Sequence, residues 1–256
     1  MKKVAIFIPA YNVSSTIPLV IDRIPKEIKS EVKEIFVIDN ASSDSTYLTV
    51  IGYKHDRDMQ NLSIIRNKEN KGYGGSQKAA YNYSIKKGYD IILMLHGDAQ
   101  YAPEYIPKIL EPLEKDEADM VFGSRMRGHP LKGGMPVWKY FGNRTLTIIE
   151  NFLLDLSLSE YHSGFRAFSV RALKKIPFGL CSNDYHFDTD ILIQFKIAGF
   201  RIKETTIPTH YGKDSKSPSV LHLFSYAWNI LISLFMYILY KKNIIKNDKF
   251  NFKVKD

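Results

Sequence analysis

The sequence predicts an α/β protein built on a doubly wound, mostly parallel β-sheet with helices on both faces. Short runs of β-branched and aromatic residues recur through the first half of the chain, and each run is apolar on both faces, as in a sheet that is covered on both sides. Helical patterns alternate with these runs. Polar loops containing glycine follow them, at the sheet edge where open α/β folds bind ligands.

Five apolar runs are expected to form the first strands. The first run stops at Pro9, with no small-residue cleavage site, so a buried strand is expected there rather than a secretory signal. Two further strands are expected later, the second of them at an edge of the sheet and ending before Pro208. The expected strands cover residues 4–8, 34–38, 62–65, 91–95, 120–122, 163–168 and 201–207.

Helices are expected between these strands. Ser14 or Ser15 can cap the first, whose apolar residues recur at helical spacing as far as Ile28. Pro18 suits its first turn. The loop over residues 127–136 is rich in glycine and proline. The other expected helices cover residues 74–87, 103–115, 140–156 and 186–198.

Composition narrows the class of protein. The chain has 256 residues, 45% of them hydrophobic and 25% charged, which excludes collagen-like and wholly disordered proteins. Its single cysteine, Cys181, excludes an intramolecular disulfide and a cysteine zinc cluster, and it favours a cytoplasmic setting. The net charge of +9 attracts polyanions: nucleic acid, anionic lipid or phosphorylated small molecules. A solvated basic surface is the alternative.

The C-terminal part differs from the rest. Residues 217–240 contain no Asp, Glu, Lys or Arg, and the tail after them holds six lysines against two aspartates. This pattern favours a helix at a membrane surface or against a partner. A transmembrane span and an ordinary core helix are the alternatives, and a span would have to satisfy polar residues such as Asn229 internally.

Asp98 is the strongest single candidate for chemistry. It follows an apolar strand in the segment His96-Gly97-Asp98-Ala99-Gln100. A carboxylate there, with nitrogen and oxygen donors two residues away on either side, can hold a divalent cation whose other ligands come from a diphosphate. The alternative is an aspartate that caps the following helix.

Other polar clusters also allow two interpretations. The carboxylates of Asp39 and Asp44 could accept hydrogen bonds from a ribose or a base. Alternatively, they belong to a turn that caps the following helix. The glycine-rich segment 71–75 suits an anion at a helix N-terminus, or tight packing. Asp188 or Asp190 suits a general base, or the acidic start of a helix. A basic set suits phosphate binding or solvated surface charge; its members are Arg125, Arg127, Lys132, Lys139, Arg144 and Arg166.

Seven elements in order resemble glycosyltransferase family 2, the nucleotide-sugar enzymes of GT-A (Rossmann-like) fold. Within the family they are most similar to dolichol- or polyprenyl-phosphate hexosyltransferases. The resemblance runs from about residue 4 to about residue 216. The elements are Pro9-Ala10-Tyr11-Asn12, Asp39-Asn40-Ala41-Ser42-Ser43-Asp44, Asn70-Lys71-Gly72, His96-Gly97-Asp98-Ala99-Gln100-Tyr101, Gly123-Ser124-Arg125, Ser163-Gly164-Phe165-Arg166 and Phe187-Asp188-Thr189-Asp190.

The resemblance implies roles for these residues. Asp98 and Gln100 match the metal-binding element, with His96 where its first aspartate would stand, so Mg²⁺ or Mn²⁺ is the implied cofactor. Arg125 matches an arginine near the phosphates, and Asp188 or Asp190 a catalytic carboxylate. Two further positions depart from the family pattern. Glu160 occupies the place of the aspartate that usually precedes the element at Ser163, and His210 occupies the place of an arginine that often precedes a pair such as Ser215-Lys216. The implied nucleotide-sugar site is Pro9, Tyr11, Asn12, Asp39, Asp44, Lys71, Gly72 and Arg166.

The implied activity is inverting transfer of a hexose from a UDP- or GDP-sugar to an acceptor, with a polyprenyl phosphate expected. A saccharide hydroxyl in cell-surface polysaccharide synthesis is the alternative, and it would need a base. A sugar nucleotidyltransferase is less favoured, because Pro9-Ala10-Tyr11-Asn12 is not a glycine-rich basic loop. Residues 1–216 are expected to form the catalytic domain and 217–256 an apolar helix and basic tail. We expect a cytoplasmic protein at the membrane periphery, and no nucleic-acid partner.

Overall fold

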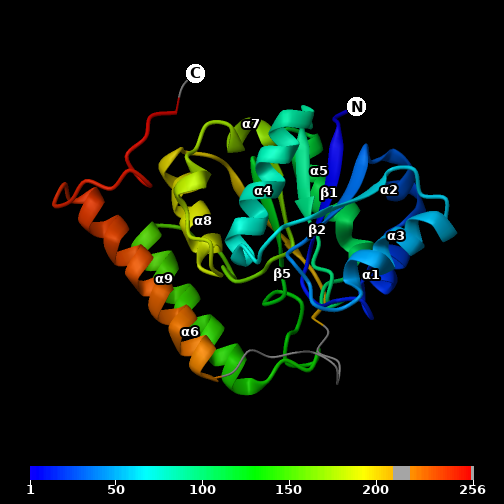
Figure 1. Ribbon diagram of the computed structural model, residues 1–256. Helices are drawn as coiled ribbons and strands as arrows, with labels where there is room; N and C mark the ends of the chain where they lie inside the picture. Colours follow the sequence, from blue (N-terminus) through cyan, green and yellow to red (C-terminus); the bar gives the residue numbers. More distant parts are fainter. Residues whose placement is uncertain (210–219, 255–256) are drawn as a thin grey trace.

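The computed structural model describes residues 1–209 and 220–254 (Figure 1). The described residues contain one seven-stranded sheet in the order β3-β2-β1-β4-β6-β5-β7. Every strand pair is parallel except those of β6, which runs antiparallel to β4 and β5. The mostly parallel sheet predicted from the sequence is therefore confirmed. Its strands are β1 (Val4–Ala10), β2 (Glu34–Asp39), β3 (Leu62–Arg66), β4 (Ile91–Met94), β5 (Met120–Ser124), β6 (Arg166–Ser169) and β7 (Ile202–Thr206).

Helices cover both faces of this sheet, because its strands are apolar on both sides. Successive side chains of a strand point to opposite faces. In β1, Phe7 therefore joins one hydrophobic core, while Ile6 and Ile8 join the other. The helices are α1 (Ile17–Arg23), α2 (Lys26–Glu31), α3 (Thr46–Asp56), α4 (Gly72–Lys87), α5 (Ile106–Glu114), α6 (Val137–Leu154), α7 (Val170–Leu173), α8 (Phe187–Ile197), α9 (Val220–Lys241) and the 3₁₀ turns η1 (Pro103–Tyr105) and η2 (Phe178–Leu180).

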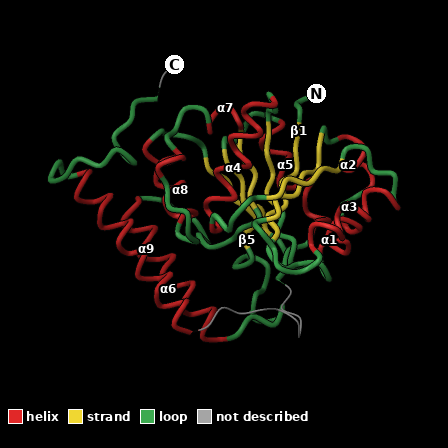
Figure 2. The backbone as a smooth tube through the Cα atoms, viewed as in Figure 1, coloured by secondary structure: helices red, strands yellow, loops and turns green. Residues whose placement is uncertain are grey.

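The two cores divide the helices between the faces. The core with α1 and α5 includes Ile21 and Ile109. The core with α4, α6, α8 and α9 includes Tyr81, Leu154 and Ile230. The tube drawing shows α6 and α9 side by side on the flank of the molecule away from α1, α2 and α3 (Figure 2).

Several element boundaries differ from the sequence prediction. The helix expected to run as far as Ile28 is wrong, because α1 ends at Arg23 and α2 begins at Lys26. Pro25 explains the break, since a proline disfavours helical geometry in the residue before it, and Ile24 is extended with ψ 128°. The strand expected from residue 163 begins only at Arg166.

Among the residues that the structure describes, the core covers one side of the C-terminal helix α9. Its side chains Ile230, Leu234 and Tyr237 are buried in the same core as α8, and Phe250 of the tail closes over Tyr237 and Tyr240. Within the described ranges, no helix combines the length and apolarity needed to cross a membrane. The expected boundary at 216/217 and the expected contacts of His210, Ser215 and Lys216 lie outside the described residues.

Candidate active site

The loops after β1 and β2 are held together by Asn12. Its side-chain oxygen accepts hydrogen bonds from the backbone N–H groups of Ser43 (2.9 Å) and Asp44 (3.3 Å). Its own N–H donates to the Ser42 hydroxyl at 3.0 Å. Asn12 adopts the left-handed φ of 54° that asparagine tolerates. Asn12 therefore orders the loop that carries Tyr11, whose side chain is exposed.

The Asp44 carboxylate is engaged by backbone N–H groups at the start of α3 and in the loop after β1, as the turn-and-cap interpretation expects. It accepts hydrogen bonds from the N–H groups of Thr46 (2.9 Å) and Ser14 (3.1 Å). Partial burial alone would raise the pKa of Asp44, but the hydrogen bonds from Thr46 and Ser14 outweigh it and lower the pKa to about 2. The ionised carboxylate thus fixes the loop that starts α3.

Asp39, at the end of β2, is buried but keeps one oxygen for a further partner. Its Oδ1 accepts the Ser42 N–H at 2.9 Å. Its Oδ2 lies 3.2 Å from Nε of Arg66, yet makes no well-directed hydrogen bond. A buried carboxylate oxygen without such a bond suits a hydroxyl or amide of a ligand. Pro9, at the end of the neighbouring strand β1, is half-buried.

The glycines that open α4 bind the protein itself. The N–H groups of Gly74 and Gly75 both donate to the carbonyl of Asn183, at 2.7 and 3.3 Å. A Cβ on Gly72, whose φ is 76°, would lie 2.4 Å from that same oxygen. These contacts fit the tight-packing alternative, because the amides of Gly74 and Gly75 already have a partner within the protein. The side chain of Lys71 remains exposed beside Gly72.

The loop after β4 carries the metal-binding candidates. Asp98 is exposed, and its Oδ1 accepts the Gln100 N–H at 3.2 Å. Within residues 1–209 and 220–254, no three His, Cys, Asp or Glu side chains form a cluster that could hold a metal. The donors Asp98 and Gln100 still fit a hard cation that takes its remaining ligands from a diphosphate and water.

His96 is packed beneath this loop. Its Nε2 lies 3.4 Å from the Tyr73 hydroxyl, and a Cβ on Gly164 would approach that nitrogen to 2.3 Å. Burial lowers the pKa of His96, against the opposing charges of Asp98 and Asp188. The His96 ring is therefore packed against Gly164, with Nε2 facing the Tyr73 hydroxyl.

Asp188 and Arg166 form a buried polar group behind His96. Asp188 accepts hydrogen bonds from the Tyr73 hydroxyl (3.1 Å) and the Gln77 amide (3.2 Å), and its Oδ1 lies 3.6 Å from Arg166 Nη1. Arg166 has no exposed surface and donates from Nε to the Ser163 carbonyl at 2.6 Å. The Arg166 guanidinium is therefore engaged inside the protein, and its expected contact with the nucleotide stays a prediction.

Asp190 is also withdrawn from the site. It lies two residues beyond Asp188, on a different side of α8. Its carboxylate accepts the Ser182 N–H at 2.9 Å and pairs with Lys249 Nζ of the tail at 2.7 Å. Asp190 thus fastens the tail and the loop before α8, and the structure does not bring it together with Asp98.

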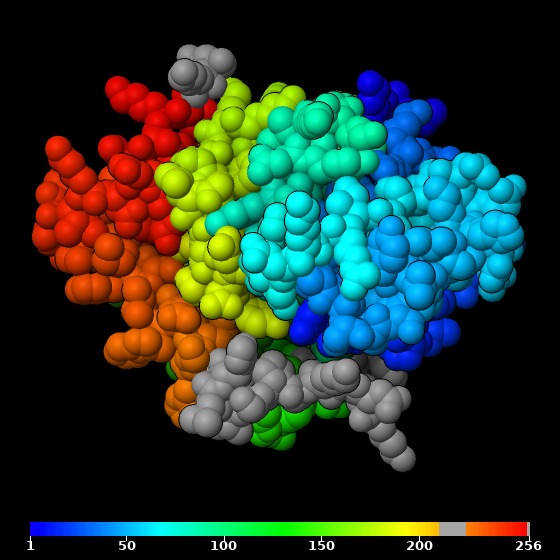
Figure 3. All heavy atoms as spheres, in the orientation of Figure 1, coloured from blue at the N-terminus to red at the C-terminus, as the bar shows by residue number. Residues whose placement is uncertain are grey.

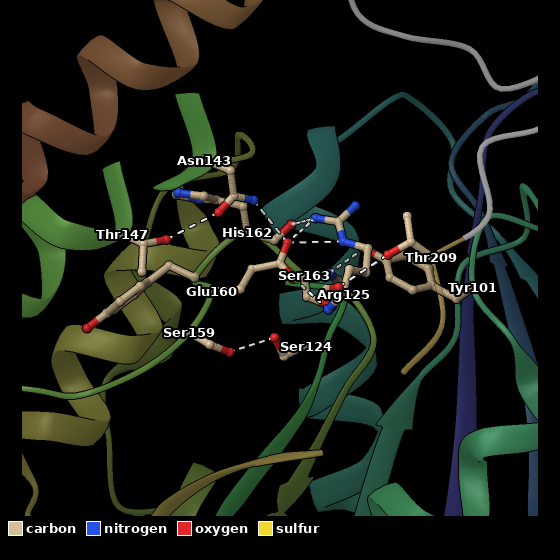
Figure 4. Close-up of polar contacts among 12 residues, drawn as sticks. Tyr101, Ser124, Arg125, Asn143, Thr147, Ser159, Glu160, His162, Ser163 and Thr209 are labelled. Carbon is tan, nitrogen blue, oxygen red and sulfur yellow. Dashed lines mark hydrogen bonds and ion pairs between the residues drawn. The ribbon is translucent and has the colours of Figure 1, made fainter. Parts of the chain in front are cut away.

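Arg125, at the end of β5, is held by Glu160 (Figure 4). Glu160 accepts the Arg125 backbone N–H at 2.9 Å, its Nε at 3.0 Å and the Asn143 amide at 3.1 Å. Burial would raise the pKa of Glu160, but the charge and hydrogen bonds of Arg125 outweigh it and lower the pKa. Arg125 also donates from Nη2 to the His162 carbonyl at 3.0 Å. Both side chains are therefore fixed in their charged forms.

Lys139 joins this cluster from the first turn of α6. Burial and the charge of Arg125 lower the pKa of Lys139, and the carboxylates of Glu160 and Asp98 oppose that shift. Lys139 therefore lies close enough to both Arg125 and the exposed Asp98 for their charges to act on its pKa. The loops that carry Arg125 and Asp98 follow β5 and β4, which β6 separates in the sheet. Of the remaining basic set, Arg127 lies 3.9 Å from Glu204, while Lys132 and Arg144 are exposed.

Sequence reasoning missed the contacts that tie α9 to this region. His162 Nδ1 lies 3.0 Å from the Tyr226 hydroxyl of α9, and His162 Nε2 lies 3.2 Å from the buried Glu150 carboxylate of α6. No pattern in the sequence selects Tyr73 within the glycine-rich segment either, although its hydroxyl contacts both His96 and Asp188. Isolated aromatic and histidine residues carry no spacing signal, so only their positions in space reveal these contacts.

These observations define an α/β fold with a polar site at the carboxyl ends of the parallel strands. The model of the family described as Glycosyl transferase family 2 matches residues 5–177. The chain belongs to this family and is a glycosyltransferase.

Its relatives include enzymes that use lipid phosphates. UDP-N-acetylglucosamine--dolichyl-phosphate N-acetylglucosaminyltransferase of Methanococcus voltae is 29% identical over 224 residues, covering 84% of this chain and 88% of that protein. Undecaprenyl-phosphate mannosyltransferase of Micrococcus luteus is 26% identical over 208 residues, covering 80% and 82%. The resemblance to polyprenyl-phosphate hexosyltransferases expected from the sequence is confirmed.

A solved structure supports the fold. Glucosyl-3-phosphoglycerate synthase of Mycobacterium tuberculosis, in complex with Mn²⁺, UDP and glucosyl-3-phosphoglycerate, superposes with a TM-score of 0.69. The identity is 18%, and the match covers 92% of this chain and 80% of that one. At this identity the likeness establishes the GT-A fold, and the predicted fold class is confirmed.

Proposed function

We propose that the protein transfers a hexose, with inversion, from a UDP- or GDP-sugar to the phosphate of a polyprenyl lipid such as dolichyl or undecaprenyl phosphate. The observation that carries the proposal is the cluster of Arg125 and Lys139 beside Asp98. Two desolvated cations next to one exposed carboxylate suit a metal-bound diphosphate together with a second phosphate. The names of the relatives in Methanococcus and Micrococcus agree with such an acceptor.

The donor would lie across the loops after β1, β2 and β4. Asp39 offers its Oδ2 to the nucleoside, and Tyr11 offers an exposed ring for a base to stack on. Asn12 and Asp44 act indirectly, since their polar atoms hold these loops in place. Lys71 extends from the start of α4 as a further cation for the phosphates.

A divalent cation fits at Asp98 and Gln100. Bound Mg²⁺ or Mn²⁺ would stabilise the charge that grows on the departing nucleoside diphosphate. Arg125 and Lys139 would supply the same stabilisation from the chain itself, and Glu160 would keep the Arg125 guanidinium oriented.

The state of the two candidate bases favours a phosphate acceptor. A hydroxyl acceptor needs a base to remove its proton. Asp188 is engaged by Tyr73, Gln77 and Arg166, and Asp190 by Lys249, so both carboxylates are already occupied by partners within the protein. A lipid phosphate is already a nucleophilic anion and needs no base.

The test is product analysis with a donor panel. The purified enzyme is incubated with UDP- and GDP-sugars, Mn²⁺ or Mg²⁺, and undecaprenyl or dolichyl phosphate, and products are identified by mass spectrometry. We expect a glycosyl phospholipid whose anomeric configuration is opposite to that of the donor. Products on soluble saccharide acceptors alone would overturn the lipid-phosphate assignment and favour a saccharide hydroxyl.

We further propose that the enzyme acts at the cytoplasmic face of the membrane, with residues 1–216 as the catalytic domain and residues 217–256 as its attachment. The acceptor supports this location, because a polyprenyl chain stays in a bilayer. Cell fractionation tests it: recovery of the full-length protein in the membrane fraction, released by salt or carbonate, is the expected outcome, and recovery only in the supernatant of unextracted membranes would contradict it.

A further inference from the structure

We propose that α6 and α9 together form a docking face for an anionic lipid bilayer, called here the two-helix face. It consists of the exposed apolar residues Trp138, Phe141, Ile148 and Phe152 of α6 and Phe224, Trp228, Ile232 and Phe235 of α9. The inference deepens the proposed function, because this face would bring the enzyme to a lipid acceptor, but it stands on observations of its own.

The outer side of α9 is as apolar as its buried side. Phe224, Trp228, Ile232 and Phe235 recur at helical spacing and are 71%, 65%, 44% and 59% exposed. On the other side of the helix, residues such as Leu234 are buried in the core. A helix that is apolar all round needs an apolar environment on every side, and the described chain covers only one side.

The exposed side of α6 continues this surface. Trp138, Phe141, Ile148 and Phe152 are 55%, 62%, 61% and 84% exposed. The two helices contact each other on the flank of the molecule (Figure 2). In the space-filling view α9 and the tail form the outer edge of that flank (Figure 3). Segments from the middle and the end of the chain therefore build one surface, and single exposed side chains would not need such an explanation.

Charge selects an anionic lipid as the occupant. Between Val137 and Leu154 the only acidic residue is Glu150, which is buried, and residues 220–247 contain no Asp or Glu. Exposed cations border the face on several sides; they are Lys132, Arg144, Lys241, Lys242 and Lys246. The exposed carboxylates of Asp155 and Asp248 follow directly after these two segments, so the five cations outnumber them. Aromatic side chains with such a net basic border match the headgroup region of an anionic leaflet.

The same charges disfavour a second copy of the chain. Two copies seated on each other would bring their basic borders together, and the exposed carboxylates of Asp155 and Asp248 are too few to neutralise the five cations of each copy. Anionic headgroups neutralise these cations instead. A bilayer also accepts the aromatic side chains without a complementary groove.

Hydrogen bonds connect the two-helix face to the cluster of Arg125 and Lys139. Tyr226 of α9 bonds to the His162 ring, and the His162 carbonyl accepts a hydrogen bond from Arg125. Lys139 lies in the same first turn of α6 as Trp138. A lipid headgroup held at this face would therefore lie on the side of the molecule that carries Arg125 and Lys139.

The sequence offers a direct test, because its only two tryptophans, Trp138 and Trp228, lie on this face, one on each helix. The full-length protein and the single-tryptophan variants W138F and W228F are titrated with phosphatidylglycerol-rich vesicles that contain no polyprenyl phosphate. We expect a blue shift of emission and quenching by brominated lipid in both variants. Binding is expected to weaken as salt rises.

Matched variants test the contribution of the apolar residues. The double variant F152S/F235S is expected to bind these vesicles about tenfold more weakly or worse. Leu48→Ser, at a 68% exposed position on α3, is the control and should bind as the parent does. Circular dichroism and thermal melting verify that each variant is folded.

Three outcomes would overturn the inference. They are the absence of a blue shift with anionic vesicles, a response from only one of the two tryptophans, and a concentration-dependent blue shift without vesicles accompanied by dimers in light scattering. The vesicle assay contains no donor and no acceptor, so it measures membrane binding alone. Its result can therefore differ from that of the transfer assay. Activity on a short-chain, water-soluble polyprenyl phosphate then tests the proposed function alone.

Discussion

Glu160 is a buried carboxylate whose hydrogen bonds hold Arg125 at the end of β5. The pair has almost no exposed surface, at 0% for Glu160 and 9% for Arg125. Removing one partner of such a pair leaves the other charge buried and uncompensated. The position of the Arg125 guanidinium, which we propose binds phosphate, therefore depends on the carboxylate of Glu160.

Glu160→Gln tests this dependence. The substitution keeps the shape of the side chain and removes its charge. We expect the free energy of unfolding to fall by about 3 kcal/mol and turnover to fall at least about tenfold, because Arg125 loses its orientation. Urea denaturation and steady-state kinetics measure the two effects. Glu160→Asp, which preserves the charge, should restore part of both, and equal damage from the two variants would contradict the charge argument.

Asp98, unlike the buried Glu160, is exposed and accepts a hydrogen bond from the backbone N–H of Gln100. Asp98→Asn should change the free energy of unfolding by no more than about 0.5 kcal/mol. It should nevertheless abolish turnover and the metal-dependent part of the thermal shift caused by UDP. Differential scanning fluorimetry with and without Mn²⁺ measures this, with Asp56→Asn on α3 as the control. Retained turnover would remove Asp98 from the metal site.

Asp44 links the site to acid stability. Its folded pKa of about 2 lies below the ordinary value of 3.8, so its ionised form stabilises the fold above about pH 4, and this contribution is lost as the pH falls toward 2. Asp44→Asn should therefore flatten the dependence of unfolding free energy on pH in that window. Urea titrations at several pH values measure the slope. An unchanged slope would show that the hydrogen bonds to Asp44 do not stabilise its charge.

At the scale of elements, the tail after α9 closes the core on the α8 side. Phe250 is fully buried against Tyr237 and Tyr240, Lys249 pairs with Asp190, and the Lys249 carbonyl accepts a hydrogen bond from Gln194 at 2.9 Å. This segment of the proposed attachment therefore packs against the core that α8 and α9 share, although its sequence predicts only a basic tail.

Phe250→Ala should cost about 3 kcal/mol of unfolding free energy, because it leaves a cavity in a core that does not collapse completely. Ile244→Ala, at a position 63% exposed, is the matched control and should change it by less than about 0.5 kcal/mol. Chemical denaturation of the full-length protein measures both. Equal effects would mean that the tail is an independent attachment.

The elements themselves were mostly predictable. Strand positions follow from apolar runs, which are local, and α4 ends at Gly88 in the left-handed conformation (φ 69°), as a glycine at that place indicates. α3 was not named, since only Thr46 and Val50 of its residues are buried and its apolar period is weak. The break between α1 and α2 has a local cause, Pro25. The sequence prediction missed it because apolar residues keep their helical spacing across the break, as far as Ile28.

At the scale of the whole molecule, the excess positive charge is distributed rather than collected in one groove. Part of it lies at Arg125 and Lys139, and part at the lysines that border the two-helix face. Nucleic-acid binding needs a continuous basic surface or an aromatic platform with base-sized spacing. The arrangement instead suits two phosphate-bearing partners, a nucleotide sugar and a lipid.

A thermal-shift panel distinguishes these partners. UDP or GDP with Mn²⁺ should raise the melting temperature by several degrees at saturating concentration, since a ligand that binds only the folded state stabilises it. Single- and double-stranded oligonucleotides at matched phosphate concentration should leave it unchanged. Stabilisation by oligonucleotides but not by nucleotides would contradict the assignment of the site.

The sequence by itself determined the sheet, the order of the polar loops and the family, because apolar runs, turn residues and short motifs are local properties of the chain. The tertiary structure decided which polar groups are engaged by partners within the protein. Arg166 is buried against Asp188, Asp190 pairs with Lys249, and the amides of Gly74 and Gly75 bind Asn183. Each of these contacts joins residues far apart in the chain or on different elements, and packing distance, which spacing does not encode, selects them.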